Sequence, residues 1–325
     1  MPILKQVVFP EEAETVIAGG STIKGPSTPT RLTPAMTAAV DQQFTLDEVD
    51  PIGRSEVMIY GPPKSGKTVV ATTFPPPFRW LAADGANSLK SVRWAMKDGR
   101  TSFTDPKQLV AYAPTETVNG RYIGTPQAFN LMTDMIDYWF KPEQVDQWQS
   151  LVLDSFTEIN NWALDLGLSL NKQYPTAARP LSTSDNINRQ AMTRLVTGQQ
   201  DYKSAMGLIE GFLRNVRVEC ARHNKNLIIL CHEWQDTKEA TDGSIVVTSV
   251  RPLLIGQLRD KISKDFDDVW HMEKYSKGGG IEIKVRMHGD NAVLAGSRWG
   301  TIMPREVEPD YRKMIEEVKK FHATT

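Results

Sequence analysis

A phosphate-binding pattern at residues 61–68 restricts the possible folds of this chain more than any other feature. The segment reads GPPKSGKT and matches G-x-x-x-x-G-K-[ST]. An apolar run at residues 57–60 predicts a strand directly before it, and a helix is expected from Lys67. Strand, glycine-rich loop and helix are the parts of a P-loop, whose backbone N–H groups and helix dipole attract phosphate. The predicted nucleotide-binding residues are Gly61, Pro62, Pro63, Lys64, Ser65, Gly66, Lys67, Thr68 and Val69.

Two residues of this loop have specific predicted roles. Lys67 is expected to contact the β- and γ-phosphates, and the Thr68 hydroxyl is expected to ligate Mg²⁺. The guanine-reading pattern N-K-x-D is approached at residues 171–174, but NKQY lacks the aspartate. ATP with Mg²⁺ is therefore the predicted ligand.

Apolar strands alternate with helices from residue 56 onward. Strands are predicted at 57–60, 78–83, 109–112, 151–154 and 226–231, and helices at 67–74, 87–97, 125–140 and 206–223. This alternation indicates an α/β fold with a mostly parallel sheet flanked by helices. Segments 244–250 and 280–287 predict a C-terminal β-hairpin extension, followed by a helix over 310–322. The predicted units are an arm at 1–50, a core at 51–304 and a C-terminal helix at 305–325.

The predicted N-terminal arm is flexible. Residues 19–33 are rich in Gly, Ser, Thr and Pro, and they offer too little apolar surface to offset the entropy of ordering. Two interpretations remain open: the arm is simply disordered, or it docks on a neighbouring subunit with Phe44 as an anchor.

Composition points to a soluble protein of a reducing compartment. The net charge of −1 does not indicate a globally basic nucleic-acid binder. Cys220 and Cys231 lack the spacing of a metal site and are expected to be buried thiols. No apolar stretch approaches the ~18 residues of a membrane span, and the first residues lack a signal-peptide pattern. We therefore expect a cytoplasmic protein with no membrane partner.

A second motif follows about 90 residues after the P-loop. Residues 151–155 read LVLDS, an apolar strand that ends in Asp154. Mg²⁺ prefers oxygen ligands and takes only one or two from protein carboxylates. Asp154 is therefore predicted to hold Mg²⁺ together with Thr68, although an aspartate in this place can also cap the next helix.

The residue after Asp154 is a serine, so the catalytic base is expected elsewhere. Asp84 ends the strand that follows the P-loop helix, and it is the predicted base. The segments GPPKSGKT, LAADGANS, QLVAYAPT, LVLDSFTEI and LIILCHEW, within residues 55–275, resemble the RecA-like recombinase core. The pattern looks closest to phage-encoded RecA-like ATPases of single-strand annealing. Two departures stand out: these proteins usually carry glutamate where Asp84 stands, and Asn-Gln where His232 and Glu233 stand.

The resemblance implies an ATP-hydrolysing protein that binds single-stranded DNA, assembles into a ring or filament and meets a phage single-strand binding protein. It also implies that His232 senses the γ-phosphate, although a histidine satisfied at a strand end is equally open. Glu233 is expected to be a solvated charge. A basic residue from the neighbouring subunit would complete the site, and Arg298 is preferred to Arg286 for this role.

DNA contact is predicted in the segment 171–206. It follows the strand and helix of Asp154, where the RecA-like family places its first DNA-binding loop, and its basic residues outnumber its acidic ones by five to two. The predicted contacts are Arg179, Arg189, Arg194 and Lys203, and a solvated surface insertion is the alternative. The segment 235–250 is a weaker second candidate because its charges are mixed.

The sequence leaves two other functions open. A RecA-fold helicase or packaging-type motor would share the P-loop, but it needs robust hydrolysis and usually further domains. A P-loop kinase of a small molecule would use 171–206 as a lid and would need no oligomer.

Overall fold

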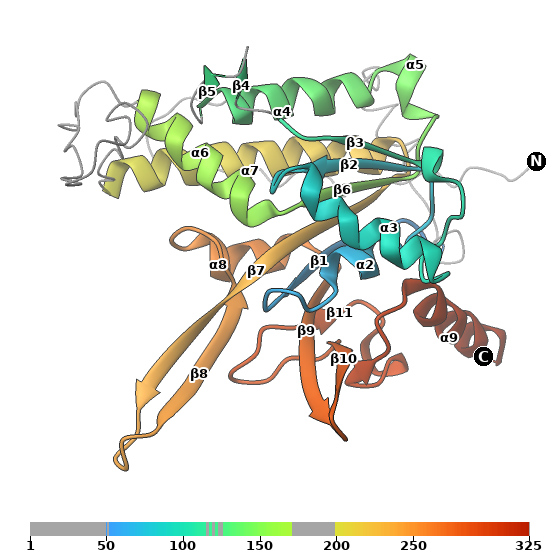
Figure 1. The fold of residues 1–325 in the computed structure, drawn as a ribbon, viewed down its shortest axis with the longest axis vertical. Helices are drawn as coiled ribbons and strands as arrows, with labels where there is room; N and C mark the ends of the chain where they lie inside the picture. The colour runs from blue at the N-terminus through green and yellow to red at the C-terminus, as the bar shows by residue number, and fades with distance from the viewer. Residues whose placement is uncertain are drawn as a thin grey trace, which may run out of the picture. The chain divides into compact units, whose positions relative to one another are not determined.

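The computed structural model describes residues 50, 52–114, 117–118, 121–122, 126–170 and 199–324. The predicted arm, apart from Asp50, lies outside these residues. From residue 52 onward, the described chain forms one central sheet covered by helices on both faces (Figure 1).

The central sheet has the strand order β12-β10-β9-β1-β7-β6-β2-β3. Its parallel part consists of β1 (Glu56–Gly61), β2 (Phe78–Ala82), β3 (Leu109–Tyr112), β6 (Ser150–Asp154), β7 (Asn226–Glu239) and β9 (Asp268–Lys277). The antiparallel strands β10 (Gly280–Arg286), β11 (Gly296–Ser297) and β12 (Glu306–Val307) extend it on the β9 side. The predicted fold class, a mostly parallel sheet with a C-terminal hairpin extension, is confirmed.

The strands β1, β2, β6 and the first half of β7 are buried on both faces, which explains their continuous apolar sequences. Met58 and Tyr60 face one core layer, formed with α4 (Pro126–Trp139), α6 (Phe156–Leu170) and α7 (Gln199–Arg222). Val57 and Ile59 face the other layer, with α2 (Lys67–Ala71), α3 (Lys90–Lys97) and α9 (Tyr311–Thr324). Alternate residues of β1 therefore pack against two separate helical layers, one on each face of the sheet.

The C-terminal helix α9 is packed into the second core layer. The Tyr311 ring stacks on Phe74 with centroids 3.9 Å apart, and Met314 and Val318 are buried. The Tyr311 backbone N–H donates to Thr73 Oγ1 at 2.9 Å. Helix α2 ends at Ala71, before residues 75–77, which are three consecutive prolines that cannot continue a helix. Helix α9 thus covers the end of the P-loop helix.

Two elements are longer than the sequence pattern predicted. The strand β7 continues through polar residues to Glu239 and pairs with β8 (Ile245–Pro252) in a hairpin that projects from the sheet (Figure 1). Helix α7 begins at Gln199 rather than 206, through residues whose polar side chains gave no periodic signal. Short elements complete the described chain: β4 (Thr117–Val118), β5 (Arg121–Tyr122), α5 (Pro142–Val145) and α8 (Leu258–Lys261).

Candidate nucleotide-binding site

The P-loop connects the carboxyl end of β1 to α2. At Gly61, an added Cβ would lie 2.8 Å from the backbone oxygen of Met272 in β9, so a larger residue would clash. Gly66 precedes α2 with a φ of 84°, a left-handed conformation that glycine adopts without strain. Backbone geometry therefore requires both glycines of the motif.

Lys67 is buried inside the loop. Its Nζ donates hydrogen bonds to the carbonyl oxygens of Gly61 and Pro62, both at 2.9 Å. Burial lowers the pKa of this ammonium, and the nearby Asp154 carboxylate opposes the shift. A buried ammonium is stabilised by an anion, so this position suits a phosphate group.

Asp154 ends β6 and faces the first turn of α2. Its Oδ2 accepts a hydrogen bond from Thr68 Oγ1 at 3.1 Å. Burial raises the pKa of Asp154 to about 6, and the charge of Asp84 adds to the shift. The ionised carboxylate is therefore destabilised in this site, and a bound divalent cation would stabilise it.

The Thr68 and Asp154 oxygens fit Mg²⁺, which takes hard oxygen ligands and few protein carboxylates. Within the described part of the chain, no group of three His, Cys, Asp or Glu side chains could hold a metal. The remaining ligands would have to come from phosphate oxygens and water, as is usual at nucleotide sites.

Asp84 follows β2, the strand that pairs with β6. Ser155 Oγ donates to Asp84 Oδ1 at 3.0 Å, and the Asp84 side chain keeps 38% of its surface exposed. Asp84 Oδ2 lies 3.9 Å from His232 Nε2. A carboxylate that is oriented by a hydroxyl and still open to water can act as a general base.

His232 lies in β7, where it is the register partner of Gly61. Its backbone N–H donates to Thr157 Oγ1 at 3.0 Å. Burial lowers the pKa of the imidazole, and the positive charge of Lys67 lowers it further. Its Nδ1 is buried and has no hydrogen-bond partner among the described residues. The structure thus brings four predicted side chains together at adjoining strand ends: Lys67, Asp84, Asp154 and His232.

Arg298 lies at the opposite end of β1 from the P-loop. Its Nη atoms donate to the carbonyl oxygens of Ile52 and Arg54 and to Ser55 Oγ, each at 2.8 Å. Its Nε lies 3.5 Å from the buried carboxylate of Asp268. The guanidinium therefore connects the amino ends of β1 and β9 by hydrogen bonds and an ion pair. It does not belong to the group of side chains around Lys67 in its own chain.

The predicted DNA contacts are mostly beyond the described residues. Arg179, Arg189 and Arg194 fall within 171–198, so their prediction stays open. Lys203 is exposed on α7.

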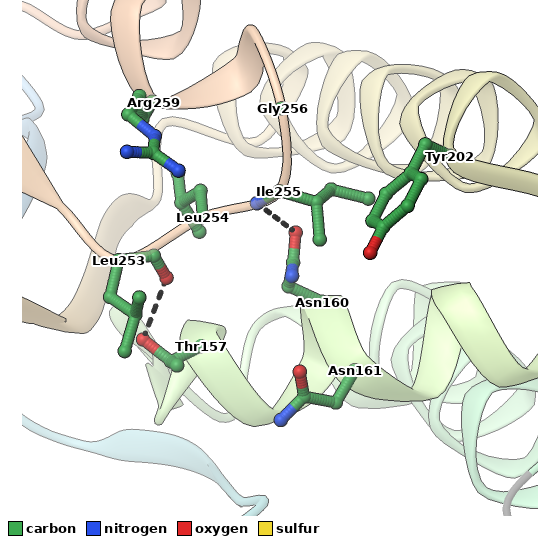
Figure 2. A pocket seen from close by; sticks show the side chains of 9 residues that line it. All are labelled: Thr157, Asn160, Asn161, Tyr202, Leu253, Leu254, Ile255, Gly256 and Arg259. Atoms are coloured by element: carbon green, nitrogen blue, oxygen red, sulfur yellow. Dashed lines mark hydrogen bonds between the residues drawn. The ribbon is translucent and has the colours of Figure 1, made fainter. Parts of the chain in front are cut away.

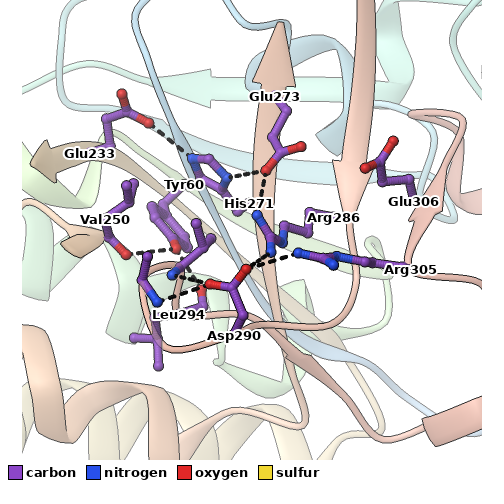
Figure 3. A network of polar contacts seen from close by, with 12 residues as sticks. Tyr60, Glu233, Val250, His271, Glu273, Arg286, Asp290, Leu294, Arg305 and Glu306 are labelled. Carbon is purple, nitrogen blue, oxygen red and sulfur yellow. Dashed lines mark hydrogen bonds and ion pairs between the residues drawn. The ribbon is translucent and has the colours of Figure 1, made fainter. Parts of the chain in front are cut away.

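Sequence analysis missed a polar network beside the P-loop (Figure 3). The two ring nitrogens of His271 lie 3.0 Å from Glu233 Oε2 and 3.3 Å from Glu273 Oε1. Arg286 Nη1 donates to Glu273 at 3.0 Å, and Lys274 Nζ donates to the Pro63 carbonyl. The expectation that Glu233 is a solvated charge was wrong, because its side chain is only 10% exposed. The charged residues of β9 were the available signal in the sequence, but no motif connects them to β7.

A polar pocket lies between α6, α7 and the segment that leads from β8 into α8 (Figure 2). Its cavity of about 470 Å³ is lined by Thr157, Asn160, Asn161, Tyr202, Leu253, Leu254, Ile255, Gly256 and Arg259. Thr157 Oγ1 donates to the Leu253 carbonyl at 3.3 Å, and Asn160 Oδ1 accepts from the Ile255 N–H at 3.3 Å. Thr157 also contacts the His232 backbone, so one hydroxyl connects this pocket to the nucleotide site.

Comparison with known proteins gave no matching family model and no matching curated protein. Among solved structures, the flagellar accessory protein FlaH from Methanocaldococcus jannaschii resembles this chain, with 10% sequence identity and a TM-score of 0.32. The alignment covers 72% of this chain and 77% of that chain. At this level the likeness carries no argument about function.

None of the helices in the described part of the chain combines the length and the apolar character needed to cross a membrane.

Proposed function

We propose that this protein is a RecA-like ATPase that binds ATP with Mg²⁺ and acts on single-stranded DNA, in annealing or strand exchange. One observation carries the ATPase part of the proposal. Lys67, Thr68 and Asp154 converge at the ends of β1 and β6, and Asp84 stands beside them at the end of β2. The P-loop strand and the Asp154 strand are separated by β7, which delivers His232 between them.

Each side chain has a distinct role in the proposed reaction. Mg²⁺ bound with ATP would neutralise phosphate charge, and Thr68 and Asp154 would hold it. The Lys67 ammonium stabilises negative charge on the β- and γ-phosphates as the bond to the γ-phosphoryl group breaks. Asp84 orients water and accepts its proton. His232, whose pKa is lowered by burial and by the charge of Lys67, would contact phosphate as a hydrogen-bonding group.

The DNA and oligomer parts of the proposal have a separate basis. They depend on the family resemblance, on the basic excess of 171–206 and on the exposed Lys203 of α7. A neighbouring subunit would supply a basic residue, and Arg298 remains the predicted one. Because its guanidinium already contacts five groups of its own chain, this role requires rearrangement at the start of β1.

The proposal is tested by measuring ATP turnover and oligonucleotide binding side by side, without nucleotide, with ADP and with a slowly hydrolysed ATP analogue. We expect binding of single strands to depend on the nucleotide, together with a change in assembly size. Unwinding of a forked duplex would instead identify a helicase. Phosphorylation of a small molecule, without DNA binding, would identify a kinase.

The Lys67→Ala variant is the control for the site itself. It should lose ATP turnover and bind nucleotide more weakly, because no other P-loop ammonium is buried against the loop carbonyls. Turnover at the parental rate in this variant would show that the P-loop assignment is wrong.

A further inference from the structure

Four exposed side chains form a stripe along α3, called here the α3 stripe: Lys90, Arg93, Trp94 and Lys97. Their spacing of three, four and seven positions places them on one face of the helix. The other face buries Val92 in the core layer shared with α2 and α9, and Ala95 is also buried. The helix is therefore anchored on the sheet, with the stripe facing solvent.

The α3 stripe concentrates positive charge in a chain whose net charge is −1. Within the described residues, neither Lys90 nor Arg93 nor Lys97 forms an ion pair with a carboxylate. Arg100 follows just after the helix and is paired with Asp98 at 2.9 Å. A patch of uncompensated cations on one face attracts a polyanion.

Trp94 adds an aromatic surface to these cations. Its side chain is 65% exposed, whereas six of the eight tryptophans are buried. Lys97 Nζ lies 5.2 Å from the centre of the Trp94 ring, so cation and ring occupy the same patch. Proteins bind single strands with this combination, because bases stack on the ring while cations contact phosphates.

We propose that the α3 stripe is a binding site for single-stranded nucleic acid, in which Trp94 stacks on a base and the three cations contact phosphates. The inference rests on the proposed function, and it names a contact surface outside residues 171–206. Charge complementarity and the exposed ring favour this occupant over a membrane. An interfacial helix inserts an apolar face, and the apolar face of α3 is already buried in the core.

The chain path connects the α3 stripe to the nucleotide site. Asp84 and Gly85 lead through a 3-10 turn (Ala86–Leu89) directly into α3. Asp84 is held by Ser155, which follows Asp154. Because Asp84 leads directly into α3, we expect nucleotide binding to alter the stripe, so that binding of the single strand depends on ATP.

The test uses the full chain and a labelled oligothymidylate, with affinity measured over a range of salt concentrations. Replacing Lys90, Arg93 and Lys97 together by glutamine should lower the log–log salt slope by about 2, because each lost contact with a single strand removes ~0.7. Trp94→Ala should weaken binding about 5- to 150-fold, which is the usual cost of one lost base–aromatic stack. The matched control replaces Lys313, Lys319 and Lys320 of α9 by glutamine, which removes the same charge from the exposed face of another helix.

Tryptophan fluorescence gives a second readout. Oligothymidylate should quench the parental protein, and Trp94→Phe should lose most of this quenching, while Trp234→Phe, at the other exposed tryptophan, should keep it. Unchanged melting temperatures are expected for all variants because the replaced side chains are exposed.

Three results would overturn the inference. If the parental protein binds DNA and the glutamine variant keeps its slope and affinity, the contacts lie elsewhere and the proposed function stands. If the parental protein binds no oligonucleotide in any nucleotide state, the DNA part of the proposed function fails as well. If the stripe variants lose binding to anionic phosphatidylserine vesicles but not to oligonucleotide, the stripe is a membrane site.

Discussion

Asp84 and Asp154 are two aspartates at neighbouring strand ends with different surroundings. Asp154 is buried and hydrogen-bonded to Thr68, whereas Asp84 is partly exposed and hydrogen-bonded to Ser155. Burial suits a metal ligand, because the cation offsets the desolvated charge, and exposure suits a base that must reach water. The two environments therefore assign Asp154 to metal binding and Asp84 to the role of base.

Asparagine substitutions should separate these roles. Asp84→Asn should lower ATP turnover by ~10²–10⁴-fold, the usual contribution of a general base, with nucleotide affinity nearly unchanged. Asp154→Asn should instead remove the Mg²⁺ dependence of nucleotide binding. Turnover and nucleotide affinity, measured with and without Mg²⁺, check both expectations. The assignment is wrong if Asp84→Asn loses binding while Asp154→Asn retains it.

The pKa of Asp154 also predicts a pH dependence of stability in the metal-free protein. Its folded pKa, about 6, lies above the value of about 4 for an unfolded aspartate. The stability contributed by this residue is therefore fully present below about pH 4 and lost as the pH rises through about 6. We expect the free energy of unfolding to fall over this range by up to ~3 kcal/mol more than in Asp154→Asn. Urea unfolding at several pH values measures the difference, and parallel curves for the two proteins would contradict it.

At the scale of elements, the C-terminal strands form a wall beside the P-loop. Strand β9 pairs with β1 in parallel and with β10 in antiparallel fashion, so it carries charged side chains to the loop. Arg286 in β10 is nearly buried and joins Glu273 to Asp290, whereas Arg305 contacts the same Asp290 from the surface. The two arginines offer a matched pair that differs mainly in burial.

Arg286→Ala should therefore cost about 3–5 kcal/mol of stability, because it removes the buried guanidinium that pairs with Glu273. Arg305→Ala removes only an exposed ion pair and should cost less than about 1 kcal/mol. Chemical denaturation of both variants checks the contrast. Equal losses would mean that the network contributes no more than a surface contact.

At the scale of the whole molecule, single-strand binding is predicted to use a surface that can be altered without affecting the P-loop. Replacing Arg179, Arg189 and Arg194 together by alanine should lower the salt slope by roughly 2, at ~0.7 per lost phosphate contact. ATP binding should survive, since this segment lies outside the P-loop and the strand that carries Asp154. Salt titrations of this variant and of the α3 stripe variant measure how many phosphate contacts each of the two surfaces makes. A parental slope here would assign 171–206 to a solvated insertion or a lid.

Local sequence determined much of the fold and the centre of the site. The P-loop residues were predictable because glycine spacing and a preceding apolar strand are local properties, and residues 57–60 and 151–154 form strands as expected. Helix α3 was also predicted, but its exposed stripe was not recognised, because the sequence alone does not show which face the core covers.

Only the tertiary structure decided which distant side chains meet. Strand order places β7 between β1 and β6, and this brings His232 beside Asp84, a contact between residues far apart in the chain. The same order sets Glu233 against His271 and removes Arg298 from the site of its own chain. Such contacts follow from the packing of the complete sheet, in which burial and hydrogen bonding across strands determine the partners, and no local pattern encodes that packing.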